Sequence, residues 1–196
     1  MKKVVYSIAL LLIIGGVSLT GYSIFQIWDS NQAQKEALVQ AEEIVSTPPV
    51  QEAVEKEIMI PTYEKGETMG VLEVPKFGEK MPIIEGTDEE ELSKGVGHYL
   101  GTALPTQNDQ IVLSGHRDTL FKRFDELEIG DTFVVKLEYG DFTYEIVDTK
   151  IVDADDRTII KSTSPNEELI VTTCYPFGYL GDAPYRYIFY GKKVQN

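Results

Sequence analysis

The sequence predicts a mostly β fold, either a barrel or a sandwich, attached to one membrane-spanning helix. About eight short segments rich in β-branched and aromatic residues are separated by turns that contain glycine, proline or aspartate, a pattern typical of strands. Helical spacing after the N-terminal region is confined to short stretches. Residues 4–28, in contrast, form a long apolar run without a charged side chain.

The composition of the 196-residue chain is that of an ordinary globular protein, with 42% hydrophobic and 26% charged residues. This length leaves room for one domain and a tail. The net charge is −14 and no basic patch is evident, which argues against a nucleic-acid partner. The chain has one cysteine and therefore no internal disulfide. We expect Cys174 to be either a buried, unreactive residue or a reactive group.

The N-terminal region has the features of a membrane anchor. Lys2 and Lys3 precede the apolar run of residues 4–28, which as a helix is longer than the roughly 30 Å hydrocarbon core of a bilayer. Positive charges before the run and acidic residues after Trp28 favour a cytoplasmic N-terminus and an extracellular body. A cleaved signal peptide is the alternative, but the run is long for one and no clear cleavage site follows. We expect residues 1–28 to be an uncleaved single-pass anchor.

Residues 29–67 differ from the remainder in composition and in hydrophobic pattern, and we expect them to form a stalk. A short helix over residues 33–44 is predicted to continue out of the membrane and to end at residues 47–49, which include two prolines. The acidic stretch that follows has no sustained period, so we expect it to be partly disordered. Residues 68–196 are then the folded domain.

Within that domain a helix is predicted after the first two strands. Thr87 is suited to the N-cap of this helix and Glu90 completes a capping box. The acidic run 88–91 could instead be a cluster of Ca²⁺ ligands, although capping explains it without a metal. Strands are expected at residues 70–75, 81–84, 110–113, 133–138, 142–149, 168–174 and 185–191, with a helix at 119–127 and a strand or loop over 151–161.

Three side chains at strand ends have the chemistry of a nucleophilic site. Cys174 ends an apolar strand, His116 follows another and Arg186 lies near the start of a third. A cysteine acts as a nucleophile only as a thiolate, and it needs a proton-transfer partner and a group that receives negative charge. His116 can be the first and Arg186, with its forked donors, the second. From the residues alone, an inert cysteine, a structural turn and a surface arginine remain alternatives.

The same residues resemble the sortases, membrane-anchored cysteine transpeptidases of Gram-positive bacteria. The resemblance lies in the Gly-His-Arg of residues 115–117, a strand that ends in Thr173 and Cys174, and Arg186 farther along. The family's strand motif is usually written TLxTC, and the sequence at residues 170–174 is IVTTC, so the first two positions carry other strand formers.

The similarity covers residues 69–192 and is greatest to class D sortases, with class A as the alternative. It rests on the sequence CYPFGYLGDAPYRYI, which begins at Cys174, and on the absence of an obvious pilin-type lid insertion. It implies a closed eight-stranded β-barrel with short helices. His98 matches a recurrent position in the family that has no catalytic role.

The resemblance also implies a reaction. Cys174 would attack the threonine carbonyl of an LPxTG-like sorting signal near the C-terminus of a surface protein. An amine of a peptidoglycan precursor, lipid II, would then take the acyl group from the thioester. His116 would transfer protons, and Arg186 would steady the signal and the oxyanion. This chemistry requires no metal and no cofactor.

Two other functions remain open at this stage. A cysteine hydrolase would form the same acyl-enzyme and resolve it with water. A non-enzymatic surface β-domain would not need the thiol at all. The L,D-transpeptidases also pair cysteine with histidine, but their SHGC-like sequence around the nucleophile is absent here.

Overall fold

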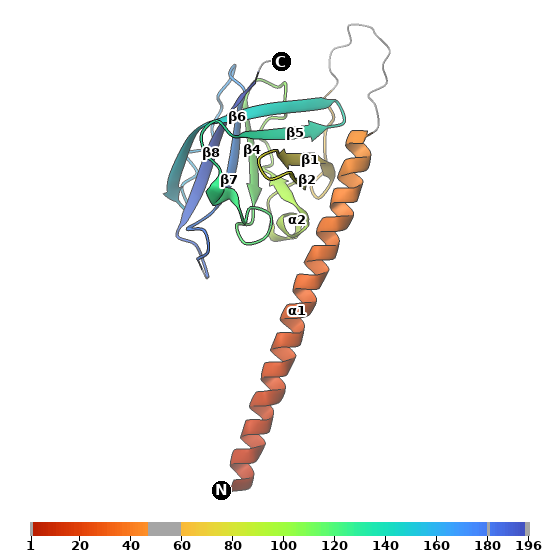
Figure 1. Ribbon diagram of the computed structural model, residues 1–196, viewed down its shortest axis with the longest axis vertical. Coiled ribbons are helices and arrows are strands. Elements are labelled where there is room, and N and C mark those ends of the chain that lie inside the picture. The colour runs from red at the N-terminus through yellow and green to blue at the C-terminus, as the bar shows by residue number, and fades with distance from the viewer. Residues whose placement is uncertain (1, 47–59, 180, 195–196) are drawn as a thin grey trace.

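The computed structural model describes residues 2–46, 60–179 and 181–194, with side chains from residue 6 onward, and contains a β-barrel beside one long helix (Figure 1). The elements in chain order are α1 (Lys2–Ser46), β1 (Thr68–Val74), β2 (Glu79–Glu85), α2 (Glu89–Lys94), β3 (Val96–His98), β4 (Gln110–Gly115), η1 (Phe124–Glu126), β5 (Thr132–Leu137), β6 (Gly140–Asp153), β7 (Glu168–Tyr175) and β8 (Tyr185–Lys193).

The strands close into a barrel in the order β1-β2-β3-β4-β7-β8-β6-β5. The closed eight-stranded barrel implied by the family resemblance is therefore confirmed. Two pairs are parallel, β2 with β3 and β4 with β7, and the other neighbouring strands are antiparallel. Because parallel strands end at the same edge of a sheet, the carboxyl ends of β4 and β7 lie together.

The barrel interior is filled by apolar side chains that alternate with outward-facing ones along the strands, as in β5. Its centre is an aromatic cluster in which Phe121 stacks on Phe124 at a ring-centroid distance of 3.9 Å. Phe133 and Phe189 meet each other edge to face at 5.9 Å and both contact Phe124. Burial of each such ring contributes about 1.5–3 kcal/mol. The cluster anchors the segment between β4 and β5 to the core.

A second, smaller cluster covers part of the outer barrel surface. It joins Val112 of β4, Ile170 of β7 and Ile188 of β8, with Tyr99 and Ile159 packed against them. The wall formed by β4, β7 and β8 is thus buried on both faces here. This explains the unbroken apolar sequence of β7, which is typical of strands covered on both sides.

α1 shows that residues 29–46 lie on the folded domain, where a stalk was expected. Residues 47–59, which hold most of the stretch expected to be partly disordered, lie outside the described residues. The helix predicted at residues 33–44 exists, but it is part of one helix that continues to Ser46 and packs against β1, β2 and α2. Ala37 and Ala41 are buried in this contact, because their small side chains allow the helix to approach the barrel closely. The predicted helix end at residues 47–49 lies outside the described residues.

The described residues that follow also lie against the barrel. Ile60 and Tyr63 pack on the main core, and the backbone N–H of Gly66 donates to the carbonyl of Glu85 at 2.8 Å. Burial and the carboxylate of Glu138 raise the pKa of Tyr63, whose hydroxyl donates to that carboxylate at 3.4 Å. These contacts could not be inferred from the composition of the segment, which is polar and lacks a period.

Two local predictions were wrong in detail. α2 has Asp88 at its N-cap rather than Thr87, and Asp88 makes no side-chain capping bond but pairs with Lys65. Glu90 forms an ion pair with Lys94 at 2.9 Å, so the capping box does not form.

The predicted helix at residues 119–127 consists of turns and the single 3-10 turn η1. The apolar residues of this segment are spaced as in a helix, but two of them, Phe121 and Phe124, are buried in the barrel core instead. Residues 96–98 form an additional strand, and the strand expected at 142–149 extends over the full length of β6.

Asp109 organises the segment between β6 and β7. Its carboxylate accepts bonds from the backbone N–H of Thr163 at 2.6 Å and of Ser164 at 3.2 Å, and from the hydroxyl of Ser162 at 2.9 Å. These donors, the Thr163 N–H first, hold the pKa of Asp109 below its ordinary value. One charged side chain therefore fixes the loop that leads into β7.

The depressed pKa makes this contribution dependent on pH. It stabilises the fold above the ordinary carboxyl pKa and is lost as pH falls through the lower, folded-state value. We expect Asp109→Ala to lower the thermal unfolding temperature at pH 7 and to have progressively less effect in acid, with Asp109→Asn intermediate. Melting curves from pH 7 to pH 3 check this, and a deficit independent of pH would contradict it.

Candidate active site

Strand register brings Cys174, His116 and Arg186 to one edge of the barrel. In the parallel pair β4–β7, Gly115 lies opposite Thr173, so His116, the next residue, leaves β4 beside Cys174. In the antiparallel pair β7–β8, Cys174 lies directly opposite Arg186. All three line the same groove. The meeting of these side chains, predicted from the sequence, is present in the structure.

The groove runs over the outer face of the barrel and has a volume of about 290 Å³. Its floor is the outward-facing side of β4 and β7, and one wall is the segment that follows β6. The residues that line it are Thr87, Leu92, Tyr99, Val112, Ser114, Gly115, His116, Ala154, Asp156, Arg157, Ile159, Ile160, Thr172, Thr173, Cys174 and Arg186.

A second hollow of about 460 Å³ adjoins the first at the same three side chains. It is lined in addition by Arg117, Asp118, Ala154, Gly181, Asp182 and Ala183. The thiol of Cys174, which is unpaired and half-exposed, therefore lies where two depressions meet. An extended chain laid across this point would have space on both sides of the sulfur.

The turn after β4 fixes the backbone at His116. The N–H of Phe121 donates to the His116 carbonyl at 3.0 Å, and the Phe121 ring is buried in the aromatic cluster. A Cβ at Gly115 would lie 2.6 Å from this ring, so only glycine fits. The sequence Gly-His, followed five residues later by phenylalanine, is thus one structural unit. The His116 ring is 30% exposed, and its Nε2 lies 3.8 Å from the exposed carboxylate of Glu89.

Arg186 is held by the backbone of its own loop. Its Nη1 donates to the carbonyls of Tyr185 at 3.0 Å and Ala183 at 3.3 Å. The guanidinium lines both hollows from this position. The strand register places Arg186 opposite Cys174, and the forked donors of an arginine suit it to stabilise negative charge.

Thr172 and Thr173 have opposite environments, which sequence reasoning did not distinguish. The hydroxyl of Thr173 is buried in the barrel wall and donates to the carbonyl of Gly115 at 2.7 Å. It ties β7 to the residue before His116. Thr172 lines the groove on the other face, and its hydroxyl oxygen is buried without a hydrogen-bond partner among the described residues. The alternation of faces along a strand is the signal that could have separated them.

Arg117 is a further residue whose role was not predicted. Its guanidinium donates to three carbonyls of the loop between β7 and β8: Pro176 at 3.2 Å, Tyr179 at 2.7 Å and Gly181 at 2.8 Å. It also lies 5.7 Å from the centre of the Tyr179 ring. The residue after His116 therefore fixes the loop that joins Cys174 to Arg186.

His98 is not part of the groove. Its Nδ1 lies 2.6 Å from the Glu85 carboxylate and its Nε2 lies 3.0 Å from the Ala103 carbonyl, both in the interior. This agrees with the structural position that the resemblance implied. In the part of the chain that the structure describes, no group of three or more acidic, histidine or cysteine side chains could hold a metal ion.

Comparison with known proteins identifies the family. Residues 72–194 match the model of the sortase domain. The chain is 48% identical to Sortase D of Bacillus subtilis over 202 residues, which cover 99% of this chain and all of that protein. The chain belongs to the sortase family, with its similarity to class D confirmed, and it is a sortase transpeptidase.

Solved structures agree with the fold. A Clostridium perfringens Sortase D5 transpeptidase matches with a TM-score of 0.69 at 22% identity, covering 84% of this chain and 99% of that one. Sortase C1 of Streptococcus suis matches with a TM-score of 0.62 at 27% identity, covering 67% of this chain and 75% of that one. The barrel described above is therefore the sortase barrel.

The two threonines offer a matched test of how β7 positions the site. Thr173→Val removes the bond to the Gly115 carbonyl without a change of shape, and we expect a loss of about 1 kcal/mol in stability together with lower activity. Thr172→Val removes an unpaired hydroxyl, so stability should stay the same or rise. Chemical unfolding of both variants checks this, and equal destabilisation by the two substitutions would contradict it.

Arg117 is expected to act as a positioning residue. Without its three carbonyl contacts the β7–β8 loop loosens, and a misplacement of about 1 Å can reduce kcat/KM by up to about a hundredfold. We expect Arg117→Ala to raise KM for peptide more than it lowers kcat, and Arg117→Lys to recover only part of the loss. Arg123→Ala, which removes an exposed pair with Glu126, is the matched control and should leave both constants unchanged. An equal fall in kcat for Arg117→Ala and Arg123→Ala would contradict this role.

Proposed function

We propose that the groove is the active site of a transpeptidase that cleaves an LPxTG-like sorting signal after threonine and joins the acyl product to a cell-wall amine. The observation that carries the proposal is the register of β4, β7 and β8, which puts Cys174 between His116 and Arg186. A thiol at a strand end, flanked by a proton-transfer group and a cation, has the components that acyl transfer requires.

Each side chain has a distinct role in the proposed reaction. The Cys174 thiolate attacks the threonine carbonyl, and Arg186 stabilises the oxyanion and steadies the signal. His116 protonates the departing amine as the peptide bond breaks, which leaves a thioester. The incoming amine loses a proton to His116 and attacks the thioester, and the C–S bond breaks. The Cys174 thiolate leaves, so the thiolate and the protonated His116 are restored.

The shape and polarity of the groove support a peptide substrate. The first hollow has Val112, Ile159 and Leu92 in its lining, which suit the apolar leucine and proline of a sorting signal. The second hollow provides space beyond the sulfur for the leaving segment or the incoming amine.

We also propose that residues 1–28 anchor the enzyme in the cell membrane and that residues 68–196 form its extracellular catalytic domain. In the described part of the chain one helix is long and apolar enough to cross a membrane. Its large apolar side chains between Tyr6 and Trp28 are exposed, as lipid contact would require. Lys2 and Lys3 favour a cytoplasmic N-terminus. The partners would be surface proteins with a C-terminal sorting signal and the amine of lipid II.

Peptide turnover with and without an amine tests the reaction. We expect the protein to cleave an LPxTG-type peptide after threonine and to form a ligated product when an amine is added. Cys174→Ala should abolish both activities with little loss of folding, because the side chain is half-exposed at a strand end. His116→Ala and Arg186→Ala should each reduce turnover by at least about a hundredfold.

The outcomes separate the competing functions. Cleavage without any ligated product would indicate a cysteine hydrolase. Turnover retained in Cys174→Ala would exclude the mechanism. No reaction with any sorting peptide, in a folded protein, would favour a non-enzymatic surface domain.

A further inference from the structure

α1 joins the apolar run to the barrel without a hinge. The helix is continuous from Lys2 to Ser46, and residues 29–46 contain no glycine or proline, the usual causes of a kink. Residues 6–29 are exposed, and Ser30 already donates to the Ser93 carbonyl of α2 in the folded domain. A helix that spans a bilayer over residues 4–28 therefore enters its contact with the catalytic domain almost at once.

The contact extends far enough along α1 to prevent pivoting. Near its start, the side chains of Ser30 and Gln34 both donate to the carbonyl of Ser93 at the end of α2, at 3.1 and 3.2 Å. Near its end, Lys80 of β2 donates to Glu42 at 3.1 Å. From Ser30 to Glu42 the helix rises by about 18 Å.

The middle of the contact is close and apolar. Ala41 is completely buried and Ala37 nearly so, and the hydroxyl of Thr68 donates to the Gln40 side chain at 3.1 Å. In contrast, Val39 on the same turns is 67% exposed. The helix thus presents a defined face to the barrel, which fixes rotation about its axis.

This contact also determines which end of the barrel is nearest to the apolar run. α2 meets α1 at Ser30 and Gln34, within about 9 Å of Trp28 along the helix axis. The first residue of α2, Glu89, is 3.8 Å from Nε2 of His116. The catalytic edge of the barrel therefore lies beside the membrane-proximal part of α1.

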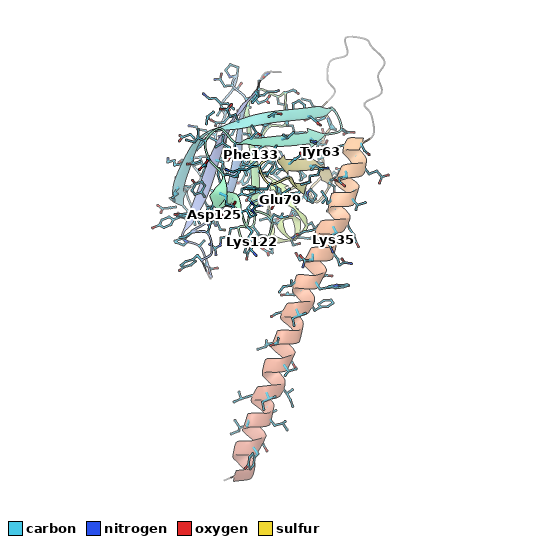
Figure 2. The ribbon with its side chains drawn as sticks, in the orientation of Figure 1. Lys35, Tyr63, Glu79, Lys122, Asp125 and Phe133 are labelled. Atoms are coloured by element: carbon cyan, nitrogen blue, oxygen red, sulfur yellow. The ribbon has the colours of Figure 1, made fainter. Side chains whose placement is uncertain are left out.

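The figures show the same orientation. In Figure 1 the carboxyl end of β4 and the loop between β7 and β8 point toward the N-terminal half of α1, whereas the C-terminus lies at the opposite end of the barrel. In Figure 2 the labelled Lys122 and Asp125, from the segment after His116, lie at that same lower edge. The end of β4 and the β7–β8 loop, whose residues help to line the two hollows, thus lie at the end of the barrel nearer the proposed bilayer.

We propose that α1 is a rigid mount that holds the groove toward the membrane at a fixed, short height, so that spacing from the lipid surface selects substrates. This inference rests on the function and anchoring proposed above. A flexible stalk would let the site reach scissile bonds over a wide range of heights. A docked helix restricts it to chains whose reactive segment is held close to the bilayer, where the effective concentration of a tethered group is high.

A change in helix length tests the mount directly. The full-length protein is placed in liposomes with LPxTG-type peptides tethered to the same bilayer through Gly/Ser spacers of graded length. Insertion of seven helix-forming residues between Trp28 and Asp29 adds about two turns and raises the barrel by about 10 Å. Because two turns are nearly complete rotations, the barrel keeps almost the same direction about the helix axis. We expect turnover of the shortest-spaced peptide to fall by at least about tenfold, because a tether that cannot span the gap gives almost no effective concentration.

The same insertion should be rescued by longer spacers. About three additional extended residues restore 10 Å of reach, so the spacer optimum should shift by at least that much. An untethered peptide should be cleaved equally by both proteins. An unshifted spacer profile would overturn the proposal, whereas failure of the original protein to cleave the untethered peptide would instead overturn the proposed function.

A second variant tests the docked face and applies even if the insertion damages the enzyme. Ala37→Glu combined with Ala41→Glu places two carboxylates in the closely packed contact and should release the barrel from α1. We expect this variant to accept long spacers that the original protein processes poorly, with untethered turnover unchanged. Val39→Glu, at an exposed position, is the matched control and should keep the original profile. Identical profiles for all three proteins would contradict the mount.

Discussion

The parallel pairing of β4 with β7 is the interaction on which the rest of the site depends. It brings two carboxyl ends to one edge of the barrel, where His116 leaves one strand and Cys174 ends the other. β8 then starts at the same edge and places Arg186 opposite the thiol. A slip of one residue in β7 would turn the thiol into the barrel interior. The bond from Thr173 to the Gly115 carbonyl opposes that slip from within the wall.

The two loops that flank the site are ordered by a common device. Each is held by one charged side chain that satisfies several backbone groups at once. Asp109 accepts from backbone N–H groups of the β6–β7 segment, and Arg117 donates to three carbonyls of the β7–β8 loop. The loops can thus be polar and solvent-facing while the groove between them keeps its shape. Charge-assisted bonds of this kind are stronger than neutral ones.

The sequence was informative where chemistry and strand pattern coincide. The apolar alternation predicted the strands. The chain has one cysteine and two histidines, so few residues could form a nucleophilic pair. It was uninformative where a residue's role depends on a distant partner. The helical spacing of residues 119–127 came from Phe121 and Phe124, which serve the barrel core. The polar composition after Trp28 concealed a docking face, since two buried alanines leave almost no hydrophobic signal.

We propose that the barrel register makes Cys174 the acyl acceptor from a sorting signal. Intact-protein mass spectrometry of the enzyme mixed with an LPxTG-type peptide, quenched in acid before release, tests this most directly. We expect a mass increase equal to the segment up to threonine, located at Cys174 by fragmentation and lost when an amine is added. Cleavage of the peptide without that adduct, or an adduct that persists in Cys174→Ala, would contradict it.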